Sequence, residues 1–222
     1  MTKNKQYSYM FDPENPPQSL GPVASSTWNK DPKRLLFTLA RYKFVAKMFA
    51  GADDVLEIGC GDAWASRIVA QHVKNLTAVD YDNRFIQAAQ KNSSPRWPIN
   101  LHTHDPLTEP PDDIGRFDYI YLLDVFEHIA PAEEKHFLES VKRLMHPHAA
   151  LLIGIPSLES QSLIPPDRRD PGHINCKTGD ELSALLKTFF NNVFIFSMND
   201  EVVHTGHYQM AHYLFALCCS KK

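Results

Sequence analysis

The sequence predicts an α/β fold in which a mostly parallel β-sheet carries helices on both faces. Short apolar runs alternate with segments of helical periodicity along most of the chain. The run 117–123 is continuous and apolar, as suits a central strand buried on both faces. The run 55–58 leads into a glycine turn and a helical segment over 63–72. We expect a single domain over 31–222, preceded by an N-terminal arm over 1–30.

The first half of the chain shows the alternation most clearly. Apolar residues recur at spacings of three and four over 32–49, and an Asp-Pro pair gives this helix a start signal. Residues 76–80 and 99–104 are expected to be strands, and 83–91 between them is expected to be a helix. A loop rich in proline and acidic residues then leads to the strand over 117–123.

The second half continues the pattern and then changes it. A helix is expected up to residue 145, with acidic residues in its first turn and basic residues in its last. A strand over 149–155 and a long loop precede a helix over 180–187, which a Thr-x-x-Glu capping box begins. The last two β-rich runs, 192–198 and 208–218, are close enough in sequence to form an antiparallel pair.

Composition narrows the class of protein. The 222 residues, 43% hydrophobic and 22% charged, suit one soluble globular domain. The chain has no apolar run near the ~20 residues of a membrane span and no apolar signal region, so we expect a cytoplasmic protein without a membrane span. The net charge of −3 argues against a nucleic-acid partner. Four scattered cysteines form no zinc or disulfide pattern.

The glycine turn after 55–58 indicates a nucleotide-like ligand. Gly59 and Gly61 allow backbone to approach a ligand closely and to adopt positive φ. A dinucleotide fingerprint would need a further glycine where Trp64 stands. The segment Glu57-Ile58-Gly59-Cys60-Gly61, with an acid two places before the first glycine, instead resembles motif I of the class I methyltransferases that use S-adenosylmethionine (SAM).

This resemblance implies a Rossmann-like seven-stranded sheet in the order 3-2-1-4-5-7-6, with the last strand antiparallel, and SAM as the cofactor. Asp80, about twenty residues beyond the first glycine, has the spacing of a ribose-binding carboxylate. Tyr81 is expected to pack against adenine, and Asp105 to accept from its exocyclic amine. The residues assigned to the cofactor are Glu57, Gly59, Cys60, Gly61, Asp80, Tyr81, Asp105 and Asp124.

The chemistry is expected just beyond the strand over 117–123. If one helical turn follows that strand, Asp124, Glu127 and His128 share a face at i, i+3 and i+4. The segment is similar to the E-x-x-E-H segment of ubiquinone-pathway and small-RNA ribose O-methyltransferases, where it is associated with a divalent metal. His173 is placed like a further histidine of the RNA group. We assign catalysis to His128 and His173. A magnesium site of Asp124, Glu127, His128 and His173 is the less favoured alternative.

The acceptor is expected to be a polar small molecule, such as a sugar, a nucleotide-sugar or a phosphate-bearing metabolite. Arg168 and Arg169 can bind an oxyanion of such an acceptor bidentately. Three alternatives stay open at this point: an N-methyltransferase acting on a small amine, an RNA ribose 2′-O-methyltransferase, and a non-catalytic partner subunit with the same fold. The sequence is compatible with a monomer or a homodimer.

Overall fold

The structure, a computed structural model, describes residues 8–11, 13, 19–111 and 114–222. Its sheet has eight strands in the order β3-β2-β1-β4-β5-β8-β6-β7. The strands are β1 Asp54–Ile58, β2 Asn75–Asp80, β3 Asn100–Thr103, β4 Phe117–Leu123, β5 Met145–Pro156, β6 Phe190–Asn199, β7 Val202–His204 and β8 Tyr213–Lys221. The first five pair in parallel, and β8 runs antiparallel to both β5 and β6. The expected strand order is therefore confirmed, with β7 as one additional short edge strand.

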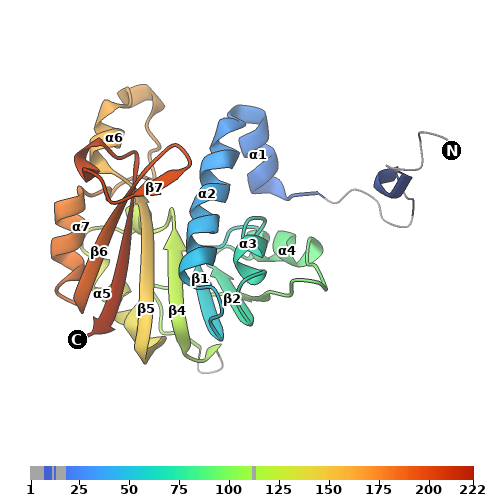
Figure 1. The fold of residues 1–222 in the computed structure, drawn as a ribbon, viewed down its shortest axis with the longest axis horizontal. Coiled ribbons are helices and arrows are strands. Elements are labelled where there is room, and N and C mark those ends of the chain that lie inside the picture. Colours follow the sequence, from blue (N-terminus) through green and yellow to red (C-terminus); the bar gives the residue numbers. More distant parts are fainter. Residues whose placement is uncertain (1–7, 12, 14–18, 112–113) are drawn as a thin grey trace.

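Helices cover both faces of the sheet (Figure 1). The α-helices are α1 Pro22–Lys30, α2 Lys33–Met48, α3 Arg67–Ala70, α4 Asn83–Lys91, α5 Glu134–Arg143, α6 Leu158–Leu163 and α7 Gly179–Leu186. Short 3₁₀ helices within the described residues include η2 Ser8–Phe11, η4 Phe126–His128, η5 Pro166–Arg168 and η6 Tyr208–Met210. Figure 1 shows α2 in front of the sheet and α5 behind it.

The apolar core is divided by the sheet. Behind it, the inner sides of α5 and α7 pack on alternate residues of the strands, with Phe137 and Leu182 fully buried. In front, α2 and α3 pack on the opposite residues, with Val45 and Val69 fully buried. The buried side chains come from both faces of the central strands, as the continuous apolar run over 117–123 predicted.

Several local expectations are wrong. The segment expected to be an N-terminal arm contains helix α1 over residues 22–30, where no helix was expected; residues 1–7, 12 and 14–18 lie outside the described residues. The helix expected over 63–72 is short, because turns occupy most of it and only Arg67–Ala70 is α-helical. Asp31 does not cap α2 with its side chain. The capping box before α7, in contrast, is confirmed, with Thr178 and Glu181 bonded reciprocally.

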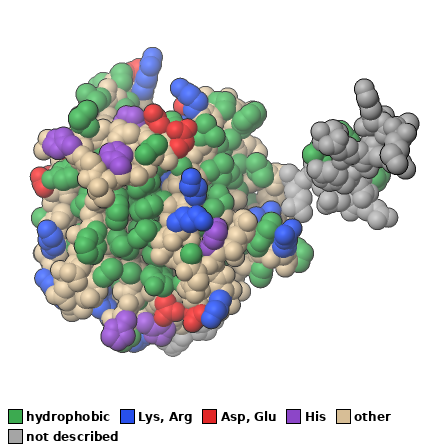
Figure 2. Space-filling model, in the orientation of Figure 1, with side chains coloured by type: hydrophobic (Ala, Val, Ile, Leu, Met, Phe, Trp, Pro, Cys, Tyr) green, Lys and Arg blue, Asp and Glu red, His purple; other side chains and the backbone are tan. Residues whose placement is uncertain are grey.

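One part of the front face carries no described helix. Hydrophobic side chains gather there beside α2, over β5, β8 and β6 (Figure 2). Phe194 on β6 is 53% exposed, while Phe44 on α2 packs against Phe196 and Phe215 at the border of this area. Among the described residues, every helix is too short or too polar to cross a membrane.

The topology brings three chain segments to one edge of the sheet. β1, β2 and β4 are neighbours and parallel, so their carboxyl ends lie side by side. The residues that follow these ends are Gly59, Tyr81 and Asp124. Ligands bind at this edge in open α/β sheets, and α1 and α6 rise above it on either side in Figure 1.

Candidate active site

The glycine turn is bonded to the end of β2. The backbone N–H groups of Gly59 and Cys60 both donate to the carbonyl of Val79, at 2.8 and 3.0 Å. Gly61 donates its N–H to Asp80 Oδ2 at 2.9 Å. Gly59 and Gly61 have φ of 77° and 54°, where a side chain is disfavoured. The turn therefore keeps the predicted glycines and Asp80 in one fixed arrangement.

A cavity of about 470 Å³ opens beside this turn. Its lining combines residues from the ends of β1, β2 and β4 with residues from the loop after β3, namely Ile58, Gly59, Asp80, Tyr81, His104, Asp105, Pro106, Leu107, Asp124, Val125, His128 and Ile129. The volume lies within the range of ligand sites, roughly 300–1,000 Å³. Six of the predicted site residues thus line one cavity, although they are spread along the sequence from Gly59 to His128.

The polar groups in this cavity have distinct surroundings. Asp80 is buried and also accepts the N–H of Asp82, so its carboxylate is oriented before any ligand binds. Tyr81 is 72% exposed at the rim, where its ring is free to cover a flat ligand. Asp105 accepts the N–H of Leu107 and is exposed at the same rim. The predicted ribose, adenine-face and adenine-edge contacts are compatible with these positions and remain predictions.

Glu57 lies beneath the turn and outside the cavity lining. Its carboxylate accepts hydrogen bonds from the hydroxyls of Tyr42 on α2 and Tyr121 on β4, at 2.6 and 2.7 Å. Burial raises the pKa of the Glu57 carboxyl, and hydrogen bonds from neighbouring hydroxyls oppose that shift. In this arrangement Glu57 ties α2 to the strand that carries the glycine turn, and a direct contact with the cofactor remains a prediction.

Asp124 does not belong to the group of ligand atoms that lie within 4.8 Å of one another around the two histidines. It adopts φ of 57°, a strained left-handed conformation for a residue with a side chain. The 3₁₀ turn η4 begins only at Phe126, so the expected helical face shared with Glu127 and His128 does not form. Instead, Arg41 of α2 donates to both carboxylate oxygens of Asp124, at 2.9 and 2.6 Å. The Arg41 guanidinium also lies over the Tyr213 ring, 3.8 Å from its centroid.

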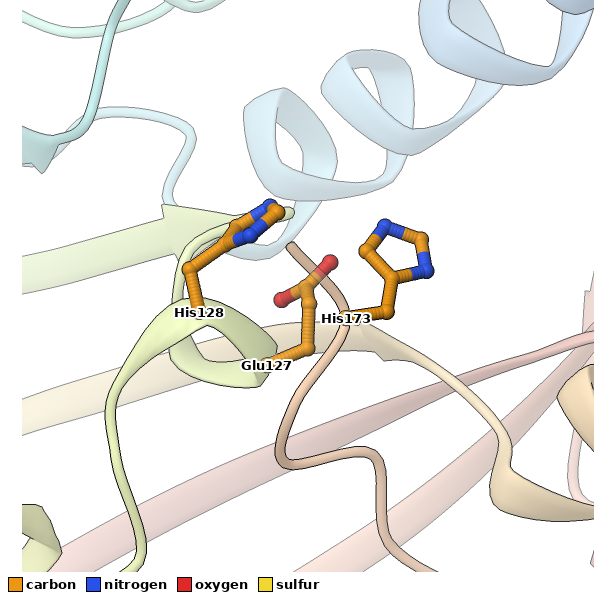
Figure 3. A group of neighbouring side chains, drawn as sticks. All are labelled: Glu127, His128 and His173. Carbon is orange, nitrogen blue, oxygen red and sulfur yellow. The ribbon is translucent and has the colours of Figure 1, made fainter. Parts of the chain in front are cut away.

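The structure brings together the other three residues of the predicted cluster. Glu127 and His128 come from η4, and His173 comes from the long segment between β5 and α7. One ligand atom from each lies within 4.8 Å of the others. Figure 3 shows the Glu127 carboxylate between the two imidazole rings, whose centroids are 5.2 Å apart. These side chains can therefore act on the same atom of a bound molecule.

Each imidazole is held through Nδ1. His128 Nδ1 lies 2.8 Å from the carbonyl oxygen of Gly172, and His173 Nδ1 lies 3.0 Å from Gln161 Oε1. A carbonyl oxygen only accepts, so the neutral rings carry their protons on Nδ1. The Nε2 atom of each ring then has a free lone pair, available as a base or as a metal ligand. Burial lowers the pKa of His173, which favours its neutral form.

Glu127 is the least satisfied group of the cluster. Its side chain is fully buried, and neither carboxylate oxygen has a hydrogen-bond partner among the described residues. Burial, followed by the charge of Asp124, raises its pKa well above the ordinary value. A buried polar group without a partner costs about 1–3 kcal/mol, and more when it is charged. The arrangement is therefore suited to a cation or a hydrogen-bond donor that arrives from outside the chain.

The remaining predicted residues are less closely tied to the cluster. Arg169 donates to the carbonyls of Ile164 and Ser162, so its guanidinium caps the end of α6. Arg168 ends η5 on the exposed surface of the same segment. A role for either arginine in acceptor binding remains a prediction.

Sequence reasoning missed the residues that hold this site from a distance. Arg41 and Tyr42 carried no motif, although one binds Asp124 and the other binds Glu57. Gln161, which is bonded to His173, and Asn175, which is bonded to Glu134, also lacked a local signal. Apart from the helical position of the two α2 residues, the sequence contains no pattern that would have indicated these partners.

Comparison with known proteins agrees with the geometry. Residues 55–148 match a family described as a methyltransferase domain. A probable S-adenosylmethionine-dependent methyltransferase of Mycolicibacterium smegmatis is 26% identical over 147 residues, which are 66% of this chain and 54% of that protein. The chain spans about half the length of the curated relatives it matches.

Solved structures share the fold over nearly the whole chain. An S-adenosylmethionine-dependent methyltransferase from Clostridium acetobutylicum superposes with a TM-score of 0.67 and 14% identity, covering 88% of this chain and 96% of that one. The N-methyltransferase NodS of Bradyrhizobium japonicum, in complex with S-adenosyl-L-homocysteine (SAH), gives a TM-score of 0.61 and 18% identity, covering 90% and 94% of the two chains.

Proposed function

The chain belongs to the class I superfamily of SAM-dependent methyltransferases, and from this premise we propose that it transfers a methyl group from SAM to an oxygen of a polar small-molecule acceptor. We propose an oxygen rather than a nitrogen acceptor because Glu127, His128 and His173 form a cluster at the edge of the cavity. A hydroxyl acceptor must lose its proton during transfer, and such a cluster can remove it. A neutral amine needs no base before attack.

In this proposal, SAM binds in the cavity beside the glycine turn. The adenosyl group lies along the ends of β1 and β2, with the ribose hydroxyls donating to Asp80 and the adenine beside Tyr81 and Asp105. The sulfonium then lies toward the end of β4, where Asp124 and His128 line the same cavity. This orientation directs the methyl group toward the acceptor side of the site.

Methyl transfer is an in-line displacement in which the acceptor oxygen attacks the methyl carbon and SAH leaves. Much of the acceleration comes from holding the two reactants close and aligned. In the proposal, His128 Nε2 takes the hydroxyl proton, and the bond from Nδ1 to Gly172 keeps the ring in the required tautomer. His173 lies beside it and orients the acceptor or shares the proton.

The cluster also fits a divalent cation. Glu127 offers a buried carboxylate without a partner, and each histidine offers a free Nε2 while Nδ1 is held by an oxygen. Two imidazoles and one carboxylate suit a transition metal better than magnesium, which prefers oxygen ligands. A cation bound by these three residues would supply Lewis acidity that lowers the pKa of the acceptor hydroxyl.

The test is a screen of candidate acceptors, including sugars, nucleotide-sugars and phosphorylated metabolites, that follows SAH release. The screen is run without added metal, with Mn²⁺, with Mg²⁺ and with a chelator. Turnover on a hydroxyl compound but not on its amine analogue supports oxygen transfer. Turnover on amines alone would contradict it and indicate an N-methyltransferase.

Two matched variants separate the base from the metal. Glu127→Gln replaces the buried carboxyl group by an amide of the same shape, whereas Glu133→Gln changes an exposed carboxyl group a few residues away. If a metal is required, E127Q and the chelator both abolish turnover, and E133Q does not. Activity that survives chelation ends the metal proposal and leaves His128 as the base.

A further inference from the structure

His173 reaches the cluster from a long connection between β5 and α7. The two ends of this connection meet, because Leu158 donates its N–H to the carbonyl of Lys177 at 2.9 Å. Ser157 at the same end donates its N–H to the carbonyl of His212 at 3.1 Å. Ordering such a connection costs conformational entropy at every residue. Specific contacts must therefore hold His173 in place within it.

Two hydrogen bonds join the residues around His173 to η4. Gly172, just before it, accepts from His128 Nδ1 at 2.8 Å. Asn175, two residues after it, donates its backbone N–H to the carbonyl of Glu127 at 2.9 Å. His173 lies between these two points, so its position relative to Glu127 and His128 is set by both.

The Asn175 side chain is inserted into a buried polar group. Asn175 is 5% exposed, although its neighbour Ile174 is 55% exposed. Its Nδ2 donates to Glu134 Oε1 at 2.7 Å, and its Oδ1 accepts from Lys177 Nζ at 3.0 Å. Lys177 Nζ also lies 2.5 Å from Glu134 Oε1. The amide thus forms a hydrogen bond with each of its two charged neighbours. Glu134 belongs to the first turn of α5, a helix that begins a few residues after η4.

We infer that Asn175 is a positioning residue, which acts with Glu134 and Lys177 to hold His173 beside Glu127 and His128. The kinetic consequence of this inference rests on the proposed function, whereas its structural consequence does not. The hydrogen bonds of Asn175 go to Glu134, Lys177 and the Glu127 carbonyl. Asn175 therefore acts by fixing the backbone that carries His173. The Glu134 carboxylate accepts from the Asn175 amide, and the Lys177 ammonium donates to it, so these two charged groups fix the orientation of the amide.

An isosteric exchange tests this match. Asn175→Asp replaces the donating amide by a carboxylate facing Glu134 Oε1, and two buried carboxylates at that distance cannot both be ionised. The exchange N175D/E134Q swaps the two groups, so that the amide now comes from α5 and donates to a carboxylate at position 175, while Lys177 keeps a carboxylate partner. The double variant should restore the hydrogen bond between positions 175 and 134 that the single variant N175D loses. Lys177→Met, which removes the ammonium from the same group, serves if N175D does not fold.

The first readout is the imidazole region of the NMR spectrum of the full chain at one pH, without ligand. We expect N175D to shift the His128 and His173 signals, assigned from single histidine variants, and N175D/E134Q to return them. SAH affinity by calorimetry should stay within about twofold in all variants, because the cofactor cavity does not include Asn175. Unshifted signals in N175D, or no return in the swapped pair, would overturn the inference.

The second readout is kinetic and uses an acceptor found by the screen. N175D should lower kcat by about 10- to 100-fold, as a displacement near 1 Å does, and leave KM for SAM unchanged. In a His173→Gln background the same change should cost nothing further, because Asn175 acts through His173. If N175D lowers kcat by the same factor in the His173→Gln background as in the wild type, the inference is overturned. If no acceptor is turned over, the proposed function fails, and the NMR readout still decides the role of Asn175.

Discussion

Gly61 donates its backbone N–H to the carboxylate of Asp80, with 2.9 Å between N and Oδ2. This bond joins the glycine turn after β1 to the acid that ends β2. The acid is therefore oriented by the turn that also shapes the cavity. This side of the cavity is therefore formed by the ends of two strands that are neighbours in the sheet.

Replacing Asp80 by Ala should weaken SAH binding by about 1.5–3 kcal/mol, or roughly 10- to 150-fold in Kd. The variant loses the bond from Gly61 and the carboxylate that we propose accepts from the ribose hydroxyls. Isothermal titration calorimetry measures the change. Asp53→Ala, an exposed acid before the opposite end of β1, is the control and should bind SAH like the wild type.

Gly59→Ala should destabilise the protein by about 1–3 kcal/mol more than Gly51→Ala. Both glycines have positive φ, near 80°, so the backbone strain is shared. A Cβ at Gly59 would lie 2.2 Å from Val125 Cγ2, whereas a Cβ at Gly51 would meet nothing within 4 Å. Urea unfolding measures the difference. Equal losses in the free energy of unfolding of the two variants would show that the close approach of Gly59 to Val125 does not affect stability.

His128→Asn should lower kcat by about 10²- to 10⁴-fold, a far larger factor than any change in SAH affinity. The asparagine amide can still donate to the Gly172 carbonyl in place of Nδ1, but the Nε2 base is gone. His212→Asn, in the exposed terminal hairpin, is the control. A loss below tenfold in H128N would indicate that the enzyme works by placement alone, as expected for an amine acceptor.

Glu57→Gln should show a pH-dependent stability difference from the wild type. Burial raises the folded-state pKa of Glu57 above its ordinary value of 4.5. Its stabilising contribution is therefore fully present below that value and is lost as the pH rises through the folded-state pKa. The amide introduced by E57Q does not titrate. The free energy of unfolding of the wild type minus that of E57Q should fall as the pH rises from about 4.5, and then level off.

Urea unfolding at a series of pH values measures this difference. Glu133→Gln, which removes an exposed carboxylate, should show a much smaller pH dependence. A difference that stays constant or grows with pH for E57Q would mean that Glu57 is better stabilised as a carboxylate in the folded protein than burial suggests.

Local patterns predicted the elements and the central motif well. The glycine turn at Gly59 and Gly61 was predictable because the strand before it and the helical segment after it lie within a short stretch of sequence. The capping box of Thr178 and Glu181 is a local pattern for the same reason. The strand order followed from the family resemblance and is confirmed by the pairing.

Contacts between distant segments were not predictable in this way. Arg41 and Asp124 are separated by 83 positions, and no pattern at either position indicates the other. The backbone of Asp124 is left-handed and η4 begins only at Phe126, so Asp124 does not share a helical face with Glu127 and His128. Asn175 was missed because its burial depends on the folded path of a long connection, which local propensity does not determine.

The most direct measurement of the central claim is a calorimetric titration of the wild-type chain with SAH, beside a titration with NADH. We expect saturable one-to-one binding of SAH, with a Kd in the range of about 1 µM to 1 mM typical of enzyme ligands, and no heat of binding with NADH. A folded sample that shows no heat with SAH or SAM, or that binds NADH instead, would contradict this claim.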